Sequence, residues 1–194
     1  HMTWNRRAVV LAVPVIVLLV SAVGGWALSR SSDNVDANLT TPGTEQFPTI
    51  GTNANNTGEK FSFVEVTDNA TGEAGVISPA GKPMVVNFWY STCEPCKREM
   101  PALSAASLKY GSQVDFVGIN PNDTSEVANV FLAKYKITYP TYLDDGDQLA
   151  AAGVATLPAT FFLDGKGNII ERRAGEVSAE DLTNILTTKL GVTE

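Results

Sequence analysis

The chain has 194 residues, of which 44% are hydrophobic and 18% charged, and its formal net charge is −7. Phosphate binding needs a basic surface, so this charge argues against nucleic acid as a partner. The only histidine is His1, and His1-Met2 is interpreted as a cloning remnant before a natural Met2. The absence of any other histidine excludes Cys-His nucleophile pairs, Ser-His-Asp triads and histidine metal sites. Proton transfer then falls to carboxylates, thiols, tyrosine, lysine or water.

The N-terminal part of the chain predicts a membrane anchor followed by a tether. Residues 8–28 carry no charge, and about 20 such residues suffice for a helix to cross a bilayer. Arg6 and Arg7 place residues 1–7 in the cytoplasm and the rest of the chain outside. We expect a single-pass signal anchor in the cell membrane, with a cleaved signal peptide as the alternative. Residues 29–58 are rich in small polar side chains and are expected to form a flexible linker.

Residues 59–194 are expected to form one folded domain. Strands are predicted at residues 61–66, 83–90, 114–120, 139–143, 159–164 and 168–173. Residues 67–81 are interpreted as turn-rich, with a short run at residues 75–77. Helices are predicted at residues 93–109, 124–135, 147–152 and 178–190. In the second of these helices the inward side is assigned to Val127, Val130, Phe131 and Ala133. Strands and helices alternate before a closing hairpin and helix, which predicts an α/β fold with a mixed sheet and helices on both faces.

Both cysteines of the chain, Cys93 and Cys96, lie where the apolar run at residues 83–90 leads into a helix. Pro95 falls in the first turn of that helix, where proline is tolerated. A helix N-terminus stabilises a thiolate, so Cys93 is predicted to attack and Cys96 to resolve the mixed disulfide. A purely structural disulfide would close a very short loop and stabilise little. A metal site that also uses Glu99 is a further alternative.

Two more residues are candidates for the site. Pro158 stands directly before the strand at 159–164, where a cis proline can present the Leu157 backbone to an extended substrate. An ordinary trans proline at a strand start is the alternative, and composition does not choose between them. Glu99 lies three residues past Cys96 on the same helix side and can exchange a proton when the disulfide opens. From the sequence alone, a Lys-Arg-Glu run is more typical of a solvated helix face.

Two motifs then carry a family likeness, namely Asn87-Phe88-Trp89 with Cys93-Glu94-Pro95-Cys96 and Glu99-Met100-Pro101, and Thr156-Leu157-Pro158-Ala159-Thr160 ahead of Phe161-Phe162-Leu163-Asp164. With the N-terminal anchor, they resemble the TlpA/ResA-type membrane-anchored thioredoxin-like proteins of the AhpC/TSA-redoxin superfamily. The resemblance implies a thioredoxin fold with an insertion around residues 124–143, a cis Pro158 and an active-site Glu99. The residues expected to contact substrate are Leu157, Pro158, Trp89, Glu94 and Pro95.

Members of that family typically reduce disulfides of exported proteins, notably apocytochrome c before haem attachment. The resemblance therefore implies an extracytoplasmic thiol–disulfide oxidoreductase with a Cys93–Cys96 redox disulfide and with neither cofactor nor metal. Its expected partners are exported protein thiols or disulfides and a membrane electron donor or acceptor of the dithiol type. An oxidant of secreted proteins is the alternative. A thioredoxin-fold peroxidase and a copper-delivery protein are less favoured, because their Thr-x-x-Cys and Cys-x-x-x-Cys spacings are absent.

Two positions depart from the family pattern. Thr92 directly precedes the first cysteine, where the family commonly has Trp, so a flat aromatic cover is missing. Asn87 stands where cytosolic thioredoxins carry a buried Asp. An amide cannot relay a proton, which strengthens the expectation that Glu99 is the proton carrier.

Overall fold

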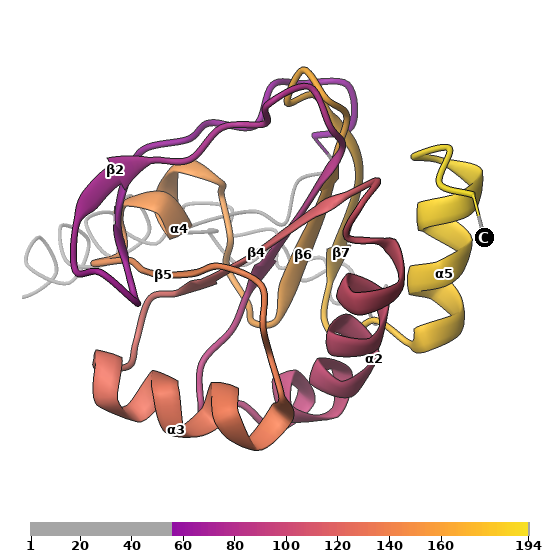
Figure 1. Ribbon diagram of the computed structural model, residues 1–194. Helices are drawn as coiled ribbons and strands as arrows, with labels where there is room; N and C mark the ends of the chain where they lie inside the picture. Colours follow the sequence, from indigo (N-terminus) through magenta and orange to yellow (C-terminus); the bar gives the residue numbers. More distant parts are fainter. Residues whose placement is uncertain (1–55, 194) are drawn as a thin grey trace, which may run out of the picture. The chain divides into compact units, whose positions relative to one another are not determined.

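The computed structural model describes residues 56–193, which contain one seven-stranded sheet with the order β2-β1-β5-β4-β3-β6-β7 (Figure 1). The strands are β1 (Glu65–Asp68), β2 (Ala74–Val76), β3 (Met84–Phe88), β4 (Asp115–Asn120), β5 (Thr141–Leu143), β6 (Ala159–Leu163) and β7 (Ile169–Ala174). The helices are α2 (Glu94–Tyr110), α3 (Ser125–Tyr135), α4 (Asp147–Ala151) and α5 (Ala179–Thr188).

The predicted membrane anchor at residues 8–28 and the linker as far as residue 55 lie outside the described residues. Within residues 56–193, no helix combines the length and apolarity that a bilayer crossing requires.

β3 lies inside the sheet, where it pairs in parallel with β4 and antiparallel with β6. Every one of its residues is buried, which explains why the run is apolar almost throughout. Val86 and Phe88 contribute to one apolar core, whereas Val85 and Trp89 contribute to the other. Because side chains alternate along a strand, Asn87 shares the face of Val85 and Trp89. This alternation sends one polar side chain of β3 toward the helix that follows.

Helices cover both faces of the sheet, as predicted (Figure 1). On one face, Met100 of α2, Phe131 of α3 and Leu182 of α5 share an apolar core. On the other face, Phe61 and the residues that follow α4, such as Val154, fill the second core. The first core also contains both cysteines, so the helix-rich face is the one that carries the redox pair.

The strand predicted at residues 61–66 begins only at Glu65. Upstream of it, the Phe61 amide donates a 2.9 Å hydrogen bond to the Gly167 carbonyl, in the turn between β6 and β7. The ring centroids of Phe61 and Phe63 lie 4.7 Å apart. The apolar residues of this segment therefore reflect burial against the second core, not membership of a strand.

The inward side predicted for α3 is wrong in part. Phe131 is buried, but Val127 and Val130 are 45% and 74% exposed. The buried stripe consists of Ala128, Phe131 and Leu132. A helix buries only one stripe about 100° wide, and the bulky Phe131 sets its centre. Two valines are consequently left on the surface.

Gly118 of β4 provides the space for Trp89. A Cβ atom added at Gly118 would lie 2.8 Å from Trp89 Nε1 and 3.1 Å from Thr141 Cγ2. Gly118 pairs with Asn87 across the sheet, so this close approach lies where β3 leads toward the cysteines.

We predict that Gly118→Ala destabilises the protein by about 1–3 kcal/mol, because it overpacks a full core. Denaturant unfolding monitored by tryptophan fluorescence measures the change. Gly75→Ala is the matched control, since a Cβ there meets nothing within 4 Å. Equal stability of the two variants would contradict the packing role of Gly118.

Candidate functional site

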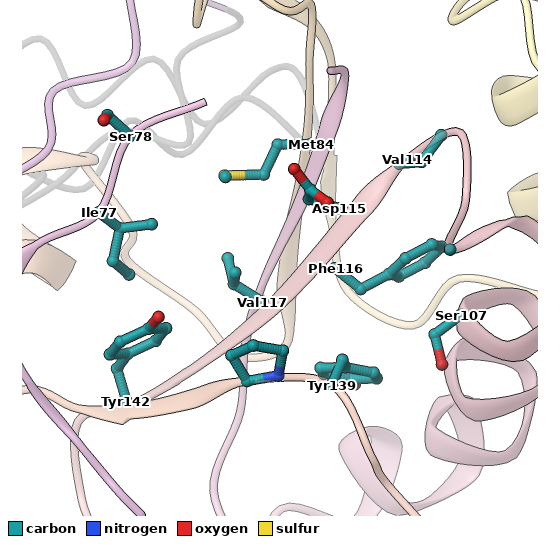
Figure 2. A pocket seen from close by; sticks show the side chains of 12 residues that line it. Ile77, Ser78, Met84, Ser107, Val114, Asp115, Phe116, Val117, Tyr139 and Tyr142 are labelled. Carbon is teal, nitrogen blue, oxygen red and sulfur yellow. The ribbon is translucent and has the colours of Figure 1, made fainter. Parts of the chain in front are cut away.

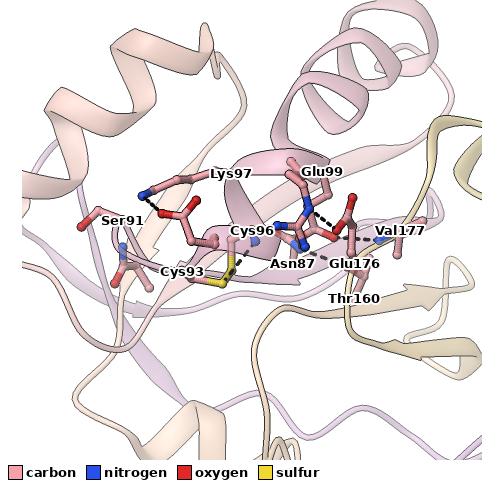
Figure 3. Close-up of a disulfide and its surroundings, with 12 residues drawn as sticks. Asn87, Ser91, Cys93, Cys96, Lys97, Glu99, Thr160, Glu176 and Val177 are labelled. Atoms are coloured by element: carbon pink, nitrogen blue, oxygen red, sulfur yellow. Dashed lines mark hydrogen bonds and ion pairs between the residues drawn. A yellow bond between two sulfur atoms is a disulfide. The ribbon is translucent and has the colours of Figure 1, made fainter.

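The two cysteines form a disulfide at the start of α2, with their Cα atoms 5.2 Å apart (Figure 3). Cys93 is the N-cap residue of the helix, and its Sγ accepts a 3.2 Å hydrogen bond from the Cys96 amide. A free helix N-terminus carries partial positive charge and unsatisfied amide groups. Once the disulfide opens, the same position stabilises a thiolate on Cys93.

The two sulfur-bearing residues differ in their access to solvent. Cys93 is 3% exposed, whereas Cys96 is fully buried. Exposed residues, Thr92 and Glu94, flank Cys93 on both sides. Cys93 is thus the less buried of the two cysteines, and the attacking and resolving roles stay predictions.

Glu99 is buried, which excludes the solvated helix face considered above. Its Oε1 accepts a 2.8 Å hydrogen bond from Asn87 Nδ2, and its Oε2 accepts a 3.0 Å bond from the Val177 amide. Burial raises the pKa of Glu99 to about 7, although both hydrogen bonds lower it and the charge of Glu176 raises it slightly. The carboxyl group can therefore take up or release a proton near neutral pH.

The rest of the Lys-Arg-Glu run lies at the surface. Lys97 pairs with Glu94, and Arg98 Nε lies 2.7 Å from Glu176 Oε2. One helix segment thus carries two solvated cations and one buried carboxyl group, a distinction that the run of charges does not reveal.

Asn87 connects α2 to β6. In addition to its bond to Glu99, its Nδ2 donates a 3.0 Å hydrogen bond to Thr160 Oγ1. Its Oδ1 is buried and has no hydrogen-bond partner among residues 56–193. Asn87 therefore serves as a donor to the carboxyl group, which suits a proton acceptor that is charged part of the time.

The Leu157–Pro158 peptide bond is cis, as the resemblance implied. In the register of β3 and β6, Ala159 lies opposite Phe88, so Pro158 lies beside the segment that leads to the cysteines. The Pro158 carbonyl accepts a 2.8 Å hydrogen bond from the Gly175 amide. Leu157 is partly exposed and Pro158 is buried, and the contact of either residue with a substrate stays a prediction.

Among the other residues expected to contact substrate, Glu94 is exposed and Pro95 is partly exposed at the helix start. Trp89 is different, because its side chain has no exposed surface and stacks on Phe131 with the ring centroids 4.7 Å apart. A fully buried ring cannot contact a docked polypeptide. The prediction for Trp89 is therefore wrong, and its role is to support the loop that carries Cys93.

A carboxylate that the sequence analysis missed fixes this loop. Asp123 Oδ2 accepts a 2.7 Å hydrogen bond from the Ser91 amide, and its Oδ1 accepts a 2.9 Å bond from Ser91 Oγ. Asn120 Nδ2 orients Asp123 through a 2.8 Å bond to Oδ2. The signal that could have found it is the Asn-Pro-Asn-Asp sequence that ends β4, because the parallel strand β3 ends on the same side of the sheet.

A separate pocket is lined by residues of β3, β4 and β5 and of the segments beside them (Figure 2). Its lining includes Met84, Asp115 and Tyr142. Met84 is the first residue of β3, whereas the cysteines follow the last. This pocket is therefore not part of the redox site. Within residues 56–193, no group of three or more His, Cys, Asp or Glu side chains is arranged to hold a metal ion.

Comparison with known proteins agrees with this geometry. The family model of Redoxin matches residues 55–188. Over 108 residues the chain is 31% identical to the thiol-disulfide oxidoreductase ResA of Bacillus thuringiensis (strain Al Hakam), which covers 55% of this chain and 62% of ResA. The chain thus spans less than two thirds of that relative. It is 30% identical over 182 residues to a DsbE homologue, a thiol:disulfide interchange protein of Paracoccus denitrificans (strain Pd 1222), which covers 92% of both chains.

A solved structure is similar as well. A secreted disulfide oxidoreductase of Mycobacterium tuberculosis, homologous to DsbE of E. coli, superposes with a TM-score of 0.56 at 26% identity, covering 62% of this chain and 92% of that one.

The mixed sheet, the helix-capping disulfide and the cis proline define a protein of thioredoxin-like fold with a dithiol–disulfide site. The chain belongs to the Redoxin family, and within it to the TlpA/ResA-type proteins that its motifs indicated.

We predict that Glu99 makes the stability of the protein fall as pH rises. Its pKa is about 7 in the folded protein, against 4.5 ordinarily. Between these two pH values the folded protein holds a proton that the unfolded chain has lost. The free energy of unfolding therefore falls by about 3 kcal/mol as the pH rises from below 4.5 to above 7. Denaturant unfolding of the oxidised protein at pH 4 and pH 8, compared with Glu99→Gln, measures this contribution. If both proteins show the same pH slope, the buried carboxyl group is not protonated in this range.

We predict that Asp123→Asn loosens the loop before Cys93. The substitution removes a charge-assisted acceptor, typically worth about 1.5–3 kcal/mol. Hydrogen exchange of the Ser91 amide should accelerate by about tenfold or more. Asp147→Asn, at an exposed position of α4, is the control. Unchanged protection of Ser91 in Asp123→Asn would show that the carboxylate does not hold the loop.

Proposed function

We propose that this protein is a thiol–disulfide oxidoreductase that acts outside the cytoplasm and reduces disulfides of exported proteins. The observation that carries the proposal is the Cys93–Cys96 disulfide at the N-terminus of α2, where Cys93 caps the helix and is the less buried cysteine. The names of the ResA and DsbE relatives support the activity, and the secreted relative supports the location. In the same proposal, residues 8–28 anchor the chain in the cell membrane.

In the reducing direction, the Cys93 thiolate attacks one sulfur of a substrate disulfide. The substrate S–S bond breaks, a mixed disulfide forms, and the displaced substrate thiolate takes up a proton. Cys96 then loses its proton and attacks Cys93, which releases the second substrate thiolate. The substrate gains two electrons and two protons, and the Cys93–Cys96 disulfide is restored.

Glu99 has the properties needed to accept the proton of Cys96. The carboxyl group is buried on the same helix as Cys96, and its pKa of about 7 matches proton exchange at neutral pH. Asn87 and the Val177 amide hold both of its oxygens in place. A membrane dithiol donor would then reduce the Cys93–Cys96 disulfide again by the same chemistry in reverse.

The proposed substrate class includes apocytochrome c, whose haem-attachment sequence Cys-x-x-Cys-His can form a disulfide. The direction of transfer depends on the reduction potential of the Cys93–Cys96 pair. We expect a value closer to the about −270 mV of thioredoxin than to the about −120 mV of DsbA. Equilibration of the purified protein with glutathione or dithiothreitol buffers measures it. A potential near that of DsbA would mean that the protein forms disulfides instead of reducing them.

We predict that Cys93→Ser abolishes reduction of insulin and of an oxidised Cys-x-x-Cys-His peptide by the full chain in detergent. Cys96→Ser should accumulate a mixed disulfide with the substrate, because nothing resolves it. Asp147→Asn serves as the active control. Mass spectrometry of the trapped species identifies the attacking residue. Turnover by Cys93→Ser, or trapping through Cys96 alone, would refute the assigned roles.

A further inference from the structure

A groove of about 480 Å³ lies beside the redox loop, on α3. We call it the α3 groove. Its lining comes from the loop before Cys93, from the first turn of α2 and from α3, and consists of Ser91, Lys97, Glu126, Val127, Val130, Phe131, Lys134 and Tyr135. In Figure 3, Ser91 and Lys97 lie on one side of the disulfide, and Glu99 and Val177 on the other. The groove is thus separate from the buried carboxyl group.

The groove exposes apolar side chains of α3 that are not buried in the core. Four large hydrophobic side chains stand out as exposed among residues 56–193, and two of them, Val127 and Val130, lie here. Phe131 both lines the groove and belongs to the core, and its ring centroid lies 4.7 Å from that of Trp89 and 4.5 Å from that of Tyr135. Adjacent exposed apolar residues on a firm aromatic base are typical of an interaction surface.

The charges of the groove favour an acidic partner. Lys97 and Lys134 both line it. Lys97 pairs with Glu94 at the rim, whereas Lys134 forms no ion pair within residues 56–193 and lies 5.4 Å from the Tyr135 ring centroid. Lys97 lowers the pKa of nearby Glu94, and Arg98 and Lys134 lower it further, so these cations act on one region. The single acidic lining residue is Glu126, whose pKa is lowered by hydrogen bonds from its own amide and from Thr124. Its carboxylate is therefore stabilised at the N-terminus of α3.

The groove extends to the loop that carries Cys93, where a substrate disulfide would react. Ser91 lines the groove, precedes Cys93 by two residues and is held by Asp123. Extended polypeptide advances about 3.3 Å per residue, so residues two to four positions from a substrate cysteine lie roughly 7–13 Å from the reacting sulfur. A substrate joined to Cys93 therefore brings neighbouring side chains within reach of α3.

We propose that the α3 groove binds the substrate polypeptide next to its reacting cysteine. It takes a large apolar side chain against Val127 and Val130 and an acidic side chain at Lys134. This inference rests on the proposed oxidoreductase function and adds the sequence that the substrate carries. The groove thereby supplies affinity at a site where Thr92 offers no aromatic cover.

The test measures the rate at which the reduced full chain in detergent is oxidised by three disulfides. One is a peptide with Leu and Glu within four residues of its cystine, the second has Ser and Lys at those positions, and the third is uncharged 2-hydroxyethyl disulfide. We expect the Leu-Glu peptide to react about tenfold faster than the Ser-Lys peptide. Val127→Ser/Val130→Ser and Lys134→Glu should each remove most of this preference while leaving the rate with 2-hydroxyethyl disulfide within twofold.

Leu108→Ser is the matched control, because Leu108 is 71% exposed and lies outside the groove. If the wild type does not react with 2-hydroxyethyl disulfide, the oxidoreductase proposal fails. If it reacts but prefers neither peptide, or if Leu108→Ser removes the preference equally, only the docking proposal is overturned. A photoreactive residue at position 130 identifies the occupant directly. Crosslinks to the Leu-Glu peptide support the proposal, whereas crosslinks to residues 29–55 or to a second copy overturn it.

Discussion

The redox end of the domain depends on one sulfur atom at the N-terminus of α2. Cys93 Sγ accepts the amide hydrogen of Cys96 and so caps the helix. The buried strand β3 ends just before this residue, and Asp123 fixes the loop between them through Ser91. Sheet, loop and helix are thus arranged so that the Cys93 sulfur that caps the helix is also the sulfur that we propose to react with a partner. Stability and reactivity depend on the same contact.

The buried polar residues behind the disulfide form a second, connected layer. Asn87 donates to Glu99 and to Thr160, which links β3, α2 and β6. Burying these groups without partners would be costly, and all but the Asn87 carbonyl have one. The raised pKa of Glu99 arises from this burial. The side chains of Lys97 and Arg98 in the same run are solvated. A carboxyl group in such a solvated position would be ionised at neutral pH.

The sequence motifs placed the Cys93–Cys96 pair at a helix start and implied a cis Pro158, and the structure has both. These features follow from short motifs, which are local properties of the chain. The motifs did not predict which residues lie inside. Trp89 was expected to contact substrate but is buried, and Val130 was expected to face inward but is exposed. Burial depends on what packs across the sheet and not on hydrophobicity alone. Asp123 was missed because its partner, Ser91, is distant in sequence and meets it only through the parallel pairing of β3 and β4. The periodicity of hydrophobic residues along the chain does not predict which distant segments pair with each other.

A three-residue turn after β7 contacts two functional positions at once. The Gly175 amide bonds to the Pro158 carbonyl, and the Val177 amide bonds to Glu99. The strand edge and the acid–base group therefore share one backbone support. A displacement of either is transmitted to the other through only two intervening peptide units. Their spacing is thus set by a stretch of chain that itself contributes no reactive side chain.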